Sequence, residues 1–275
     1  MARVTDQPYC LVQSNLDPIS PEILKVAFRA VGELVDNDAQ ILAADAFGIL
    51  ADGLSAETAR TVAGQLAQAG IKVEVVNQSQ IPTLPGSHTL HRCACLPEVF
   101  MAADSLGRDE PLDWSHVVLI AAGIVPIRET KRIVRTGYKI RLATGTLGVT
   151  PVAANYLVPE KEVSIRYRQE VHGLLDIVVL DEPYRYHIRA DKFNYNYLAD
   201  RQTLNKMENF ALLVADLTSY AQGAALNRGT VAIRDDGIEA TFSYPSRHAF
   251  EEESIWLLYK FGQRRGQAWP WMYSP

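Results

Sequence analysis

Three segments in the middle of the chain alternate Lys or Arg with apolar or aromatic residues, at the two-residue spacing of a β-strand. They span residues 137–142, 163–168 and 184–189. Residues two apart in a strand lie on one face of a sheet. If the three strands belong to one sheet, a single face carries six cations: Lys139, Arg141, Arg166, Arg168, Arg185 and Arg189. Such a face would bind an anionic partner.

The distribution of charge along the chain favours this hypothesis. Residues 1–127 carry 7 Lys/Arg and 15 Asp/Glu (net −8), residues 128–206 carry 14 and 9 (+5), and residues 207–275 carry 6 and 8 (−2). A protein partner with an acidic surface is favoured and an anionic membrane surface is an alternative, whereas nucleic acid is disfavoured because the whole chain carries −5. The competing interpretation is internal neutralisation, either by the acidic N-terminal part or by nearby carboxylates: Glu160, Glu162, Glu170, Asp181 and Glu182.

A metal site is considered at His91, Cys93 and Cys95, which share one face of an alternating segment. Zn²⁺ takes four ligands at spacings such as Cys-x₂-Cys, and no second cluster accompanies these three residues, so we expect no metal. The three cysteines are an odd number, which indicates thiols in a reducing compartment. With no signal-peptide pattern in its first residues, the protein is expected to be cytoplasmic.

No recognised catalytic or cofactor motif occurs in the chain, and we expect no cofactor. The segment 143–148, Ala-Thr-Gly-Thr-Leu-Gly, is the nearest approach to a phosphate-binding loop, but it lacks the following Lys-Ser/Thr and is interpreted as a turn. Two classes of function remain. The first is a non-catalytic binding or scaffold protein, and the alternative is an enzyme or small-molecule sensor whose site is assembled from distant residues.

The apolar and turn-forming residues predict an α+β protein of two domains. Residues 1–78 form an α/β module with a strand at 9–13, helices near 21–32, 38–50 and 55–69, and a strand at 71–76. Residues 79–87, which contain Pro82, Pro85 and Gly86, form a linker. Residues 88–275 form a β-rich domain.

In the N-terminal module, the segment Gly53–Val76 resembles the last helix and strand of the C-terminal domain of the bacterial ribosomal stalk protein. The resemblance implies a small α/β sandwich, which in that family is a protein-docking module. The Gly- and Lys-rich docking helix of the family has no counterpart at Asp38–Leu50, which is acidic, so no function carries over.

In the β-rich domain, the apolar run Asp113–Val125 predicts a central strand buried on both faces and closed by Gly123 and Pro126. Helices are expected at 206–221 and 247–261. Strands followed by a long amphipathic helix, over residues 88–222, are similar to a pleckstrin-homology-like barrel with its closing helix. The aromatic C-terminal segment Gln267–Pro275 either packs on its own chain or makes a homo-oligomer contact.

Overall fold

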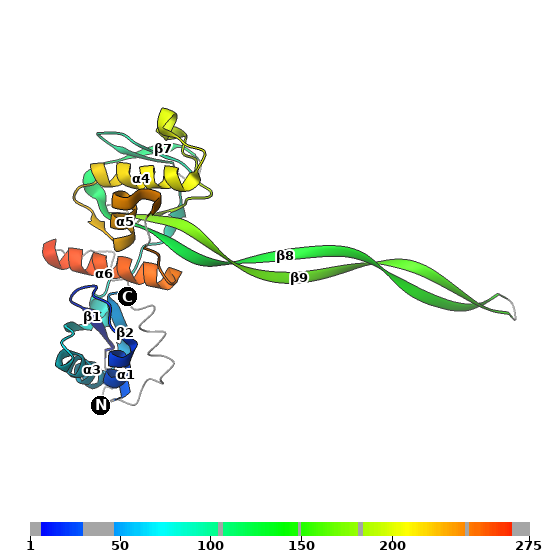
Figure 1. Cartoon of the computed structure of the whole chain (residues 1–275), viewed down its shortest axis with the longest axis horizontal. Coiled ribbons are helices and arrows are strands. Elements are labelled where there is room, and N and C mark those ends of the chain that lie inside the picture. The colour runs from blue at the N-terminus through cyan, green and yellow to red at the C-terminus, as the bar shows by residue number, and fades with distance from the viewer. Residues whose placement is uncertain are drawn as a thin grey trace, which may run out of the picture. The chain divides into compact units, whose positions relative to one another are not determined.

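The computed structural model describes residues 7–29, 47–103, 107–147, 150–180, 184–239 and 242–265, with the backbone alone over 128–147 and 150–169. The chain divides into two units. The first combines Met1–Pro126 with Val171–Pro275, and the second is Ile127–Glu170. Helices and several sheets make this an α+β protein, as the sequence predicts (Figure 1).

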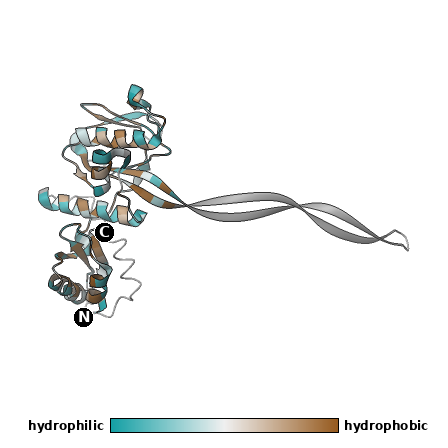
Figure 2. Ribbon diagram, in the orientation of Figure 1, coloured by the Kyte–Doolittle hydropathy of each residue, from teal (hydrophilic) through white to brown (hydrophobic). Residues whose placement is uncertain are grey.

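The N-terminal part contains a three-stranded antiparallel sheet with helices packed against it. Its strands are β1 (Tyr9–Gln13), β2 (Ile49–Leu54) and β3 (Val73–Asn77) in the order β2-β1-β3, and its helices are α1 (Pro21–Arg29) and α3 (Ala56–Gln68). The strands in this part are largely apolar in Figure 2. Side chains from both helices and from two of the strands form its core: Leu11, Leu24, Ala27, Phe28, Leu50, Ala59, Val62 and Leu66.

Local signals explain why four of these five elements were predictable. Ser55 caps α3, because its hydroxyl oxygen accepts a hydrogen bond from the Thr58 amide at 3.1 Å. Gly70 ends the helix region with φ of +80°, which a glycine adopts without steric cost. The predicted helix at 38–50 is wrong at its end, because residues 49–50 begin strand β2; its residues 38–46 lie outside the described part of the chain. Pairing with β1 overrides the helical spacing there.

A second sheet follows as a meander of three short strands. It contains β5 (Cys93–Cys95), β6 (Phe100–Ala103) and β7 (Asp109–Leu112), paired antiparallel in that order. Phe100 is fully buried, whereas Asp109 and Glu110 on β7 are exposed.

The third sheet has five strands in the order β11-β8-β9-β10-β4. Its members are β4 (Ser87–Thr89), β8 (Val117–Leu147), β9 (Thr150–Val179), β10 (Arg185–Arg189) and β11 (Ala225–Leu226). Strand β10 is antiparallel to β9, and the short outer strands β4 and β11 are parallel to their neighbours. The described strands therefore form open sheets, and the barrel-like closure suggested by the sequence is not confirmed.

The central strand was only partly predicted. It is buried over Val117–Ala122, as expected, but it begins after a short 3₁₀ helix, η2 (Trp114–His116), and continues far past Gly123 and Pro126. A Cβ on Gly123 would lie 2.5 Å from the Tyr244 ring, so this glycine makes room for an aromatic side chain and does not end the strand.

Helices cover the third sheet. The predicted helices are confirmed as α4 (Lys206–Tyr220) and α6 (Arg247–Arg265), whereas α5 (Arg228–Asp236) was not predicted. Short 3₁₀ helices lie at η1 (Gln78–Gln80), η3 (Asn196–Arg201) and η4 (Gly237–Glu239). The main core combines sheet residues such as Ile120, Ile177 and Ile188 with the apolar side of α4: Phe210, Leu213, Val214 and Leu217.

The predicted linker at 79–87 lies within the first unit. Helix α6 contacts the N-terminal sheet, since Trp256 Nε1 donates a hydrogen bond to the Gln13 carbonyl oxygen at 2.8 Å and Lys260 Nζ lies 2.6 Å from Glu74 Oε1. Independent folding of residues 1–78 stays a prediction. The aromatic segment 267–275 lies outside the described residues.

Candidate functional site

The second unit is a two-stranded ribbon made by the far parts of β8 and β9. Figure 1 shows the two strands side by side and twisted about each other. Only residues 148–149 separate them, which is the length of a tight hairpin connection. Among the described residues, β11 pairs with β8 at 119–120 and β10 pairs with β9 at 174–178, so over 127–170 each strand pairs only with the other.

The ribbon carries a charge opposite to that of the rest of the chain. Residues 127–170 contain 9 Lys/Arg and 4 Asp/Glu (net +5), and the remaining residues contain 18 and 28 (net −10). Residues 142–159, around the connection, contain no charged side chain. The ribbon is therefore cationic with an uncharged end.

Four of the six predicted cations belong to this ribbon. Lys139 and Arg141 lie in β8, and Arg166 and Arg168 lie in β9, so the predicted strands are confirmed there. Their side chains lie outside the described part of the structure, and the prediction that they share one face stays open.

Arg185, in β10 of the first unit, is already neutralised. Its Nη1 lies 3.1 Å from Asp176 Oδ2 and 3.3 Å from Glu251 Oε1, and its side chain is 10% exposed. Tyr186 and Ile188 enter the core on the opposite face, as the alternation predicts. The cation itself is buried with its carboxylates, so a partner has little access to it.

Arg189, also in β10, forms a second internal ion pair. Its guanidinium donates to Asp191 through Nε (3.1 Å) and Nη2 (3.0 Å), and Nη2 also lies 3.2 Å from His172 Nδ1. Burial raises the pKa of the Asp191 carboxyl, but the hydrogen bonds and charge of Arg189 outweigh it and leave this pKa below its usual value. Internal neutralisation thus applies to two of the six cations.

Replacing Arg189 with alanine is expected to raise the pKa of Asp191 toward that of a free aspartate, because the charge and both hydrogen bonds that stabilise the carboxylate are lost. A carboxyl whose pKa is lowered by folding contributes stability that is lost as the pH falls through its folded pKa. The variant should therefore lose less stability on acidification. NMR titration of the Asp191 carboxyl carbon checks this; an unchanged pKa contradicts it.

A polar row crosses three neighbouring strands beside Arg185. His187 Nδ1 lies 2.6 Å from Asp176 Oδ1, a spacing at which the ring N–H donates to the carboxylate, and Asp176 is nearly fully buried. His187 is paired in register with Asp176 on β9 and with Thr89 on β4. Thr89 is exposed at the edge of the sheet. The row therefore has the order carboxylate, imidazole, hydroxyl. Arg185 Nε nearby is buried without a hydrogen-bond partner.

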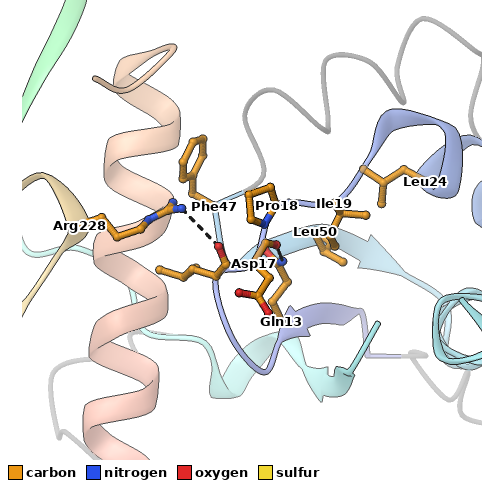
Figure 3. Close-up of a pocket in the computed structure, with 9 residues that line it drawn as sticks. Gln13, Asp17, Pro18, Ile19, Leu24, Phe47, Leu50 and Arg228 are labelled. Atoms are coloured by element: carbon orange, nitrogen blue, oxygen red, sulfur yellow. Dashed lines mark hydrogen bonds between the residues drawn. The ribbon is translucent and has the colours of Figure 1, made fainter. Parts of the chain in front are cut away.

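A small pocket of about 110 Å³ lies beside Arg228 at the start of α5 (Figure 3). Arg228 Nη1 donates to the Leu16 carbonyl oxygen at 3.3 Å, and its guanidinium lies 4.6 Å from the centre of the Phe47 ring. Gln13 Nε2 donates to the Asp17 carbonyl oxygen. These groups are used in holding residues 13–17 against α5, which indicates a structural role for the pocket.

Two of the three cysteine thiols, those of Cys10 and Cys93, are buried. Cys93 is buried and Cys95 lies next to it, and a hydrogen bond with Cys95, together with burial, keeps the pKa of Cys93 well above its usual value. Burial likewise raises the pKa of Cys10 to about 11. Within the described ranges, no three His, Cys, Asp or Glu side chains gather as metal ligands.

Among the helices that the structure describes, none has both the length and the apolar character needed to cross a membrane. Comparison of the chain with protein-family models, with curated proteins and with solved structures found no match. The ribbon and the polar row are the two features of the described residues that bear on function.

Of these two features, the polar row was not predicted from the sequence. One signal for it exists: Asp176 interrupts the otherwise apolar run Leu174–Leu180, and a buried carboxylate requires a partner. The partner, His187, could not be chosen among six histidines without the register between β9 and β10.

Proposed function

We propose that this is a non-catalytic binding or scaffold protein that engages an anionic protein surface through the cationic ribbon of β8 and β9. A cytoplasmic location belongs to the same proposal, supported by three free cysteines. The observation that carries it is a 127–170 ribbon of two strands with net charge +5 in a chain whose remainder carries −10.

The pairing of the ribbon supports a binding role. A two-stranded hairpin is at best marginally stable by itself in water, and stability normally requires a third strand or another surface to cover one face. Unpaired strand edges also present rows of N–H and C=O groups to other chains. A ribbon that pairs only internally over 127–170, among the described residues, is thus suited to being completed by a partner.

The charge of the ribbon specifies the kind of partner. Cationic surfaces raise the association rate with acidic ones, and the attraction weakens as salt screens it over about 8–10 Å. The uncharged segment 142–159 can lose water at lower cost than the charged segments on either side of it. We therefore expect electrostatic capture along the ribbon and closer packing near its connection.

Reversing two ribbon charges, R166E/R168E, is expected to weaken binding of fluorescent polyglutamate by about tenfold or more, since each close charge contact contributes on the order of 1 kcal/mol at low salt. Fluorescence anisotropy in low and high salt measures this, and the salt dependence should become shallower. Arg60 and Lys192 are exposed in the first unit. The variant R60E/K192E therefore makes the same change in net charge and should bind nearly as the natural chain does.

Equal weakening by the ribbon variant and its control would contradict the proposal, because the effect would then follow net charge alone. Binding to phosphatidylserine vesicles and, in a separate sample, to duplex DNA is measured in parallel, so that the two other classes of anionic partner are compared with polyglutamate. Stronger binding to either of these than to polyglutamate would replace the acidic protein as the favoured partner.

The polar row supports a second candidate function, an enzyme or sensor with a site assembled from distant residues. Asp176 orients the His187 ring, leaving Nε2 free to act as a base toward a hydroxyl or a ligand. Thr89 lies next in register on the neighbouring strand. No hydrogen bond between His187 and Thr89 is present among the described contacts, so this arrangement is less complete than the ribbon.

This second candidate predicts that a fluorophosphonate probe labels Thr89 and that H187Q abolishes the labelling, because the hydroxyl then loses its base. Peptide mass spectrometry locates the label. Ser87 is exposed on the same strand and pairs with Arg185, so it serves as the internal control. Absence of label from Thr89, or equal labelling of Ser87, would remove the candidate.

A further inference from the structure

We propose that the anionic partner of the ribbon is a second copy of this chain, so that the protein self-assembles. The inference rests on the proposed function and names its partner. The ribbon carries +5 and the rest of the chain carries −10, and these opposite charges recur in every copy. A surface complementary to the ribbon is thus always present at the concentration of the protein itself.

Charge also decides which surfaces meet. Two ribbons, each at +5, repel one another, which disfavours a symmetric ribbon-to-ribbon contact. The ribbon should instead contact the acidic part of the neighbouring copy. Most of that acidity lies in residues 1–126, which carry 7 Lys/Arg against 15 Asp/Glu. The contact joins two different surfaces, so it generates a closed ring or an open chain of subunits.

The open edge of the meander sheet is the receiving surface that the structure favours. Strand β7 pairs with β6 on one side only among the described strands, and its residues Asp109 and Glu110 are exposed. The receiving surface continues around the end of the sheet where β7 finishes, because Phe100 pairs with Leu112; there Glu98, in the turn between β5 and β6, and Asp113, just after β7, are also exposed. Asp109 is held by Arg92 at 2.9 Å, but Glu98 and Glu110 have no ion-pair partner within the described ranges.

Other features of this edge agree with a docking role. Asp113 accepts a hydrogen bond from the Ser115 amide at 2.8 Å, and the hydrogen bonds from Ser115 lower the pKa of its carboxyl, which keeps it charged. Pro111 has no amide hydrogen, so β7 cannot form an uninterrupted ladder with an added strand. The contact is therefore expected to depend mainly on side-chain charge.

Sedimentation velocity over a range of protein concentrations tests the inference. At about 50 mM salt the natural chain should form oligomers whose proportion rises with concentration, and about 500 mM salt should dissociate them, because the Debye length shortens severalfold. R166E/R168E on the ribbon and E98R/E110R on the receiving edge should each raise the dissociation constant tenfold or more. R60E/K192E should leave it within about twofold.

The decisive experiment exchanges the charges of the ribbon and of the receiving edge. Each variant alone should assemble weakly, but a mixture of R166E/R168E with E98R/E110R should form alternating mixed oligomers, because every ribbon then meets an edge of opposite charge. One chain with all four substitutions should also assemble again, for the same reason. Circular dichroism confirms that each variant is folded. If the natural chain stays monomeric at every concentration but still binds polyglutamate, only self-assembly is overturned. If it neither forms oligomers nor binds polyglutamate, the proposed function is overturned too. Oligomers that persist unchanged in all charge variants would also overturn the inference.

Discussion

A chain in which Asn-Gly replaces residues 130–167 is expected to lose binding to polyglutamate by about a hundredfold or more while keeping the fold of its first unit. The replacement removes 7 Lys/Arg and only 2 Asp/Glu, so the net charge falls from −5 to −10. Asn-Gly favours the two-residue turn that joins antiparallel strands, so 127–129 and 168–170 can still pair.

The first unit should tolerate this change because its apolar cores lie outside the ribbon. The main core draws on β8 up to Ala122 and on β9 from Leu175, and the N-terminal core lies within residues 11–66. The midpoint temperature of thermal unfolding should therefore change by no more than a few degrees. Anisotropy measures binding and circular dichroism measures the fold. Retained binding by the shortened chain would show that the ribbon is not the binding element.

Replacing Glu253 with alanine is expected to destabilise the protein by about 3 kcal/mol or more. Glu253 is fully buried on α6, where its oxygens accept hydrogen bonds from the Arg228 amide (2.8 Å), from Arg228 Nη2 (3.0 Å) and from the Tyr244 hydroxyl (2.9 Å). Alanine would leave the buried Tyr244 hydroxyl and the partly buried Arg228 guanidinium without this acceptor.

The effect should be large because the same network extends to the central strand. Tyr244 accepts a hydrogen bond from Asn227 Nδ2 at 2.8 Å, and Asn227 Oδ1 accepts one from the Ala122 amide at 3.1 Å. Thr230 Oγ1 also accepts from that amide, at 2.7 Å. Glu253 thereby joins α6 and α5 to β8. A cavity or a rotamer change at position 253 should therefore weaken the other hydrogen bonds of this network as well.

Urea-induced unfolding measures the loss, with E253Q as the matched variant. Glutamine keeps the size and one oxygen acceptor, so E253Q should be less destabilised than E253A. Burial raises the pKa of Tyr244, and the charge of Glu253 raises it further. Equal stability of E253A and the natural chain would show that the network does not hold these elements together.

Local signals predicted the elements whose ends are chemically marked. Ser55 and Gly70 frame α3, and the apolar spacing of α4 matches the side that enters the core. Strand β2 was missed because Ile49 and Leu50 also fit a helical spacing, and only pairing with β1 distinguishes the two structures. Periodicity alone does not contain that tertiary information.

The length of β8 and β9 was hidden for a different reason. Gly123, Pro126, Gly137 and Pro151 are residues that usually end strands, and all four lie within one of these two strands. Gly123 makes room for the Tyr244 ring, and a ribbon with open edges tolerates a proline such as Pro151, because a missing amide hydrogen on an outer edge breaks no ladder. The sequence therefore indicated cationic strands but not that they form one continuous hairpin.

For the candidate site, as for the fold, the sequence predicted the strands that carry the cations but not the contacts that depend on strand register. Alternation correctly placed Lys139, Arg141, Arg166 and Arg168 in strands, and the charge separation along the chain anticipated the cationic ribbon. The pairing of Arg185 with Asp176 was not predictable, because it depends on the register between β9 and β10 and on Glu251 from α6.

Zero-length cross-linking between copies is the most direct test of how the ribbon binds. Unlabelled and ¹⁵N-labelled natural chains are mixed at low salt, so that a cross-link between copies can be told from one within a copy. A carbodiimide then joins an amine to a carboxylate only where the two groups are in contact. We predict mixed-isotope cross-links from Lys139 or Lys161 of one copy to Glu98 or Glu110 of another, lost at high salt. Ribbon lysines that give no cross-link between copies, or that join only carboxylates of their own chain, would contradict the account.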